Sequence, residues 1–123
     1  MTTHVLHVVR AFSAQPTLGD ALMAALPEGA VVHEAPFPEA LVTHDVPDVV
    51  WVSSADAPSV DALRERFPTA SLLATLPARA STSDVVVLLA HGADLVLRDE
   101  GVVLAAAGIA SLARRRRPLA SAS

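Results

Sequence analysis

Short apolar segments alternate with segments of helical periodicity along almost the whole chain, and this alternation restricts the fold more than any other feature. The apolar segments that we predict to be strands are residues 4–9, 30–35, 48–53, 71–75 and 94–98. The predicted helices between and after them include residues 16–26, 58–67 and 101–115, and a short, weak helix at 37–44 that prolines limit on both sides. Strands that alternate with helices through short connections favour a parallel sheet.

Residues 85–89 have features of both a strand and a helix. The Val-Val-Val-Leu-Leu sequence is rich in β-branched side chains, which favours a strand. The preceding residues 81–84, however, resemble a helix N-cap, and Gly92 is typical of a helix end. We interpret this segment as a helix. The result is five βα units, (βα)5, and a doubly wound five-stranded parallel sheet of order 2-1-3-4-5.

The composition indicates one domain with an aliphatic core. The chain has 123 residues, of which 52% are hydrophobic, with only three Phe, one Trp and no Tyr. We expect the domain to cover residues 1–117 and residues 118–123 to begin a linker or a disordered tail. Cysteine is absent, which excludes thiolate catalysis and zinc sites built on sulfur. With no apolar run long enough to span a bilayer and no signal peptide, we expect a cytoplasmic protein.

The charge distribution argues against direct contact with nucleic acid. All nine basic residues are Arg, and four of them form the run Arg114–Arg117. The rest of the chain has five basic and thirteen acidic residues, whereas phosphate contacts need clustered cations. We interpret the basic run as the solvated end of a helix. Any contact with DNA is therefore expected only through an output domain outside this chain.

Four features, in their order and spacing, connect the chain to a known family. Pro47-Asp48 opens the third strand, Thr75 ends the fourth, residues 91–94 precede the fifth, and Arg98-Asp99 follows it. Over residues 4–115 the chain resembles a response-regulator receiver domain. The resemblance implies the flavodoxin-like fold and a place in two-component signal transduction. In that family a histidine kinase gives a phosphoryl group to an Asp at the end of strand three. That Asp and an acidic pair after strand one hold Mg²⁺, and a Thr or Ser and a Lys grip the phosphoryl group.

The chain departs from that pattern at each charged position. Arg10 and Ala11 stand where the resemblance places the acidic pair, and Ser53 stands at the phosphoacceptor position. Arg98 takes the position of the Lys, provided that one residue is missing from the preceding loop. Only Thr75 is retained. Mg²⁺ prefers carboxylate oxygens, so these exchanges predict a degenerate site with no metal and no catalytic residue.

The substituted positions predict a pocket that prefers an anion. We expect Arg10 and Arg98 to converge with the hydroxyl groups of Ser53, Ser54 and Thr75. Arg10 either forms an ion pair that locks one conformation or binds a small anionic ligand. The candidate partners for such an ion pair are Asp56, three residues after Ser53, and Asp99.

Enzyme activity has little support in the sequence. No Gly-x-Ser-x-Gly elbow surrounds Ser53, the glycines form no dinucleotide or phosphate loop, and the histidines have no metal-ligand spacing. We therefore predict a protein that is not an enzyme and needs no cofactor. A small flavodoxin-like enzyme remains the weakest alternative.

The leading prediction is a pseudo-receiver, a phosphorylation-independent regulatory and dimerisation module of a transcription regulator. A sensor of an anionic metabolite, bound in the degenerate pocket, is the main alternative. The dimer prediction rests on the family's habit of associating through its fourth helix, fifth strand and fifth helix. Here that face is predicted to include Val87, Leu88, Leu104 and Leu112.

Overall fold

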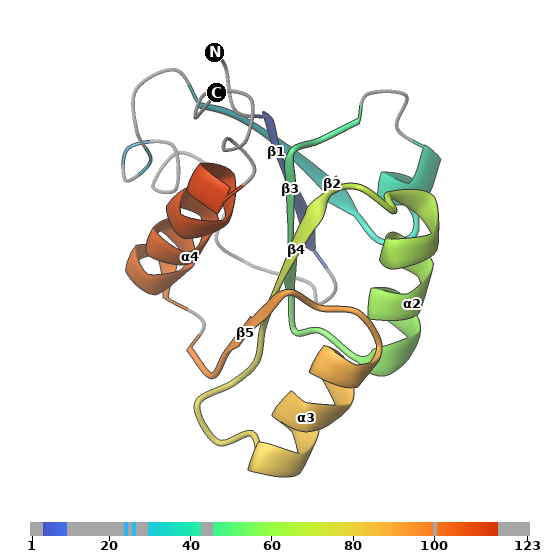
Figure 1. Cartoon of the computed structure of the whole chain (residues 1–123), viewed down its shortest axis with the longest axis vertical. Coiled ribbons are helices and arrows are strands. Elements are labelled where there is room, and N and C mark those ends of the chain that lie inside the picture. The colour runs from blue at the N-terminus through green and yellow to red at the C-terminus, as the bar shows by residue number, and fades with distance from the viewer. Residues whose placement is uncertain are drawn as a thin grey trace.

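Five parallel strands and the helices that connect them form the part of the chain that the structure describes (Figure 1). The computed structural model describes residues 4–9, 24, 26, 30–42, 46–99 and 101–115. The strands are β1 (His4–Val9), β2 (Val31–Pro36), β3 (Val49–Ser53), β4 (Ser71–Thr75) and β5 (Leu95–Leu97). The helices are the 3-10 helix η1 (Glu39–Val42), α2 (Ala57–Arg66), α3 (Thr82–Ala90) and α4 (Val102–Arg115).

The sheet has the strand order β2-β1-β3-β4-β5, with every neighbouring pair parallel. This confirms the predicted fold class and the predicted order. The register places Ser53 beside Val9 on one side and beside Thr75 on the other, and Thr75 in turn lies beside Leu97. These four residues form a row at the carboxyl ends of β1, β3, β4 and β5, and we call this row the carboxyl edge.

Helices cover the two faces of the sheet separately. In Figure 1, α2 and α3 lie on one side of the strands and α4 on the other. Val60, Leu63 and Leu88 pack with one set of strand residues, whereas Ala105 and Ile109 of α4 pack with the other set. Of the helix predicted at residues 16–26, only Ala24 and Leu26 are described, and Leu26 is buried in the core on the α4 side.

The segment at residues 85–89 belongs to helix α3, as its flanking residues predicted. Ser81 is the N-cap, and its side chain accepts a hydrogen bond from Asp84 N while the Asp84 carboxylate accepts one from Ser81 N. The helix ends before Gly92, whose φ of 121° strongly favours glycine. Strong capping at both ends thus outweighs the low helix propensity of three successive valines.

Two predicted elements are at least two residues longer than the described ones, whereas the bounds of the other strands agree within one residue. Of the helix predicted at 37–44, the described residues form the single 3-10 turn of η1 at Glu39–Val42, preceded by two prolines that cannot donate backbone hydrogen bonds. Residues 43 and 44 lie outside the described residues. The fifth strand is shorter than predicted because Asp94 does not extend it. Its carboxylate instead accepts hydrogen bonds from Leu72 N and from Arg64 Nη2, each at 2.7 Å.

No helix in the described ranges is long and apolar enough to cross a membrane.

The single Trp of the chain, Trp51, lies in the middle of the sheet and is buried in the core on the α4 side. Its ring stacks on that of His7 in the neighbouring strand, with ring centroids 3.9 Å apart. This pair lies two residues from the carboxyl edge along each strand, so it connects the core with the candidate site.

Candidate functional site

Ser53 ends β3 at the carboxyl edge, the position where ligands meet parallel α/β sheets. Its side chain is half-buried, and its hydroxyl group donates a hydrogen bond to the carbonyl of Val8 at 3.4 Å. Ser54, the next residue, has a φ of 51°, which is uncommon outside glycine and turns the chain sharply out of the strand. The carboxyl edge therefore presents a hydroxyl group, held by the neighbouring strand, at the end of β3.

Thr75 lies next to Ser53 in the register but is completely buried. Its Oγ1 accepts a hydrogen bond from the indole Nε1 of Trp51 at 2.9 Å. Trp51 pairs with Leu73, so Thr75 is the diagonal neighbour two residues along β4 on the same face of the sheet. The hydroxyl group that the resemblance assigns to phosphoryl binding is thus held by a core side chain.

Asp56 begins helix α2 as its N-cap. Its Oδ1 accepts a hydrogen bond from Ser59 N at 2.9 Å, and Asp56 N donates to Ser59 Oγ at 3.1 Å, which completes a capping box. Such a cap stabilises a helix by about 1 kcal/mol. The carboxylate that we predicted as an ion-pair partner of Arg10 has this structural role. Arg10 and Ala11 lie outside the described residues.

Arg98 lies one residue beyond the carboxyl edge, because Leu97 is the residue of β5 that pairs with Thr75. Its side chain is exposed, and its Nη1 donates to the carbonyl of Ala80 at 3.3 Å. The guanidinium group thus binds the loop before α3 and does not converge on the two edge hydroxyls as predicted. Asp99, the other predicted ion-pair partner, accepts a hydrogen bond from Gly101 N just before α4.

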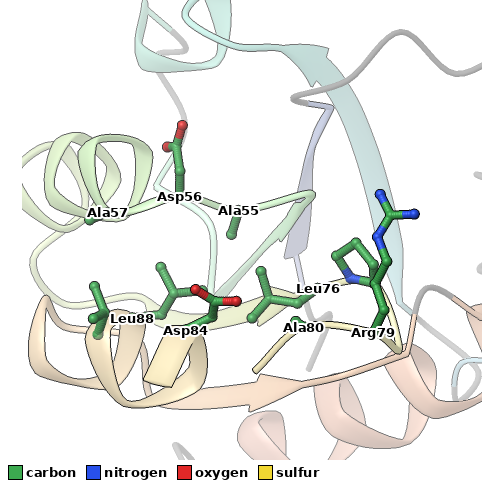
Figure 2. Close-up of a pocket in the computed structure, with 10 residues that line it drawn as sticks. Ala55, Asp56, Ala57, Leu76, Arg79, Ala80, Asp84 and Leu88 are labelled. Atoms are coloured by element: carbon green, nitrogen blue, oxygen red, sulfur yellow. The ribbon is translucent and has the colours of Figure 1, made fainter. Parts of the chain in front are cut away.

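A hollow of about 500 Å³ opens where the loops after β3 and β4 approach α3 (Figure 2). It is lined by Ala55, Asp56, Ala57, Leu76, Pro77, Arg79, Ala80, Asp84, Val87 and Leu88. Two carboxylates and one guanidinium group are among these residues, and Ser53, Thr75 and Arg98 are not. Sequence analysis missed this hollow because residues 81–84 were interpreted only as a helix cap. No group of three metal-ligating side chains occurs among the residues that the structure describes.

His7 is a second feature that the sequence did not indicate. It is buried in the core, and neither ring nitrogen has a hydrogen-bond partner within the described part of the chain. Its Nδ1 lies 4.0 Å from Oε1 of Glu34, the residue beside it on β2. Burial lowers the pKa of the His7 imidazole from 6.5 to about 4, because the charged form is poorly solvated there.

Two members of the predicted dimer face are core residues. Leu88 and Leu112 are 3% and 2% exposed and belong to the cores on opposite faces of the sheet. Val87 and Leu104, in contrast, are 42% and 49% exposed. The predicted dimer face was wrong for Leu88 and Leu112 because both helices are apolar around much of their circumference. The sequence therefore does not reveal which apolar residues face the sheet. Other large apolar side chains that are exposed in the described part of these helices are Val86, Leu89 and Val103.

Comparison with solved structures shows the same fold in receiver domains. A response regulator from Thermotoga maritima has a TM-score of 0.68 at 20% identity, over 90% of this chain and 99% of that one. HP1043, an orphan response regulator of H. pylori, has a TM-score of 0.70 at 17% identity, over 91% and 97%. The beryllofluoride-activated NtrC4 receiver domain dimer has a TM-score of 0.65 at 16% identity, over 90% and 98%.

No protein-family model and no curated protein sequence matches the chain. The structural likeness establishes the fold: five strands in the order 2-1-3-4-5 with helices on both faces, as in response-regulator receiver domains. The function has to be argued from the site itself.

Proposed function

We propose that this chain is a receiver-like regulatory module that works without phosphorylation, as part of a transcription regulator whose DNA-binding output lies elsewhere. The observation that carries the proposal is the state of the two hydroxyl groups at the carboxyl edge. Ser53 ends β3 at the position that the resemblance assigns to a phosphoacceptor carboxylate, and the Thr75 hydroxyl is buried and accepts a hydrogen bond from the Trp51 indole.

The chemistry of these groups supports the proposal. Phosphoryl transfer depends on a positioned nucleophile and on cations that neutralise the charge of the transferred group. A serine hydroxyl without a neighbouring base is a much weaker nucleophile than a carboxylate at neutral pH, and it is a poor ligand for Mg²⁺. The Thr75 hydroxyl is buried, and one of its hydrogen-bonding sites is already taken up by the Trp51 indole within the core.

A regulatory module of this kind acts through contacts with other protein surfaces. Exposed apolar side chains of α3 and α4 are available for such contacts. We call this set the α3/α4 patch; its members are Val86, Val87, Leu89, Val103 and Leu104. In Figure 1 these two helices flank β5. The NtrC4 receiver domain, which shares this fold, forms a dimer. We include self-association through the α3/α4 patch in the proposed function.

Incubation with acetyl phosphate and Mg²⁺, followed by intact mass spectrometry, tests the absence of phosphorylation. We expect the wild-type chain to remain unmodified under conditions that fully label an ordinary receiver domain. The variant Ser53→Asp supplies one carboxylate alone, and we expect it to stay essentially unlabelled because Arg10 and Ala11 still occupy the positions that the resemblance assigns to the Mg²⁺-binding acidic pair. A phosphoryl group on the wild-type chain, at Ser53 or elsewhere, would refute the proposal.

A further inference from the structure

The hollow between α2 and α3 has the size and the walls of a small-molecule site. Its volume of about 500 Å³ falls within the range of about 300–1,000 Å³ that is usual for such sites. Leu76, Val87 and Leu88 give it apolar walls, and the small side chains of Ala55, Ala57 and Ala80 leave the space open. It lies beyond the carboxyl ends of β3 and β4, where ligands bind in parallel α/β sheets.

Two carboxylates, of Asp56 and Asp84, and the guanidinium group of Arg79 line the hollow, and Asp84 is exposed at its mouth. Figure 2 shows its carboxylate between Leu88 and Leu76, whereas the guanidinium group of Arg79 points away from it. One carboxylate oxygen, Oδ2, accepts a hydrogen bond from Ser81 N at 3.0 Å. The N-terminus of a helix carries about half a positive charge, so a full carboxylate there leaves the surroundings negative. Such a hollow favours a cation.

We propose that this hollow binds a small organic cation that joins an amine to an apolar body. The ammonium group binds the Asp84 carboxylate, and the apolar body lies against Leu76, Val87 and Leu88. The half-exposed side chain of Val87 becomes covered in the complex, which contributes apolar burial in addition to the ion pair. The site does not depend on the proposed regulatory function, and each can fail without the other.

A titration followed by amide NMR tests the proposal with three matched probes: 2-phenylethylamine, 2-phenylethanol and 3-phenylpropionate. We expect the amine to shift the amide signals of residues 55–57, 76, 78–80 and 84–88, and to bind at least about tenfold more tightly than the neutral alcohol or the acid. Equal binding of amine and alcohol, or amine-induced shifts confined to other residues, would overturn the proposal.

Two variants and one control separate the ion pair from the apolar walls. Asp84→Asn keeps a side-chain oxygen that can accept the hydrogen bond from Ser81 N but removes the charge. We therefore expect the affinity for the amine to fall at least about tenfold. Glu65→Gln removes the same charge from an exposed position of α2 outside the hollow, and the affinity should stay within twofold of wild type. Ala80→Leu fills the hollow and should abolish the binding of the amine.

Circular dichroism establishes that each variant is folded before its affinity is compared. Undiminished binding in folded Asp84→Asn would rule out the ion pair, and undiminished binding in folded Ala80→Leu would rule out the hollow as the site.

Discussion

The environment of His7 differs strongly from that of a free imidazole in water. His7 is stacked on Trp51, lies near Glu34, and has a pKa of about 4 because of its burial. In the unfolded chain the imidazole regains its ordinary pKa of 6.5, so between these two values the unfolded state binds more protons than the folded state. The free energy of unfolding therefore rises with pH and decreases as the pH falls below about 6.5.

Unfolding in urea at pH 7 and pH 5 measures this effect. We expect the wild-type protein to lose about 2 kcal/mol of stability between the two values, and the variant His7→Phe, which keeps an aromatic ring beside Trp51, to lose much less. His4→Gln, at the exposed start of the same strand, is the matched control and should lose as much stability as wild type. An identical loss in the His7→Phe variant would show that other groups cause the acid sensitivity.

The residue-level contacts near the site were only partly accessible from the sequence. Ser53 could be placed at the end of its strand because the apolar run ends there. To predict the hydrogen bond between Trp51 and Thr75, one must know the register of β3 relative to β4. The two residues are 24 positions apart in the sequence, and hydrophobic periodicity does not reveal how separate strands align. The prediction for Arg98 was wrong by one residue, since Leu97 is the residue of β5 at the carboxyl edge. β5 has only three residues, so an error of one residue in its predicted end changes which side chain lies there.

At the scale of elements, α3 shows how local signals can outweigh the composition of a segment. The resemblance of residues 81–84 to a helix N-cap and the glycine after the segment were readable in the sequence, and they correctly predicted a helix where the valines favour a strand. The structure adds that Ser81 and Asp84 form a capping box. The sequence did not show which face of that helix packs against the sheet. Four of its five consecutive aliphatic residues are not fully buried, so its hydrophobic pattern has no single face.

The cap should contribute measurably to the stability of such a short helix. We expect Ser81→Ala to lower the free energy of unfolding by about 1 kcal/mol, because Asp84 N loses the Ser81 side-chain oxygen that accepts its hydrogen bond. The control is Ser83→Ala, an exposed position inside the same helix, which should be neutral or slightly stabilising. Chemical denaturation of the three proteins gives the comparison, and equal stability of all three would contradict a role for the cap.

At the scale of the whole molecule, the alternation of strands and helices was sufficient to predict the sheet order. Right-handed crossovers leave few arrangements for five βα units, and the chain adopts the expected one. The same topology brings α3 and α4 to opposite faces of the sheet on either side of β5, and both helices carry exposed apolar residues, the set that we named the α3/α4 patch. Exposed apolar surface of this kind commonly marks an interface.

Sedimentation velocity over a range of concentrations tests self-association through this patch. We expect the wild-type chain to form a dimer and Val103→Asp to sediment as a monomer, because the new carboxylate would be desolvated in the interface. Val42→Asp places the same charge at an equally exposed valine of η1, outside the patch, and should remain dimeric. A wild-type chain that stays monomeric at the highest concentrations would refute the proposed dimer.

The hydrogen bond from Trp51 to Thr75 also bears on any attempt to build new chemistry at the end of β3. A carboxylate introduced at position 53 would neighbour a hydroxyl group that already accepts a hydrogen bond within the core. Removing the indole to release that hydroxyl would be costly, because the loss of a large buried ring destabilises a protein unless neighbouring side chains fill the space. A redesign of this end of the sheet would therefore need coordinated substitutions on β3 and β4 rather than a single exchange.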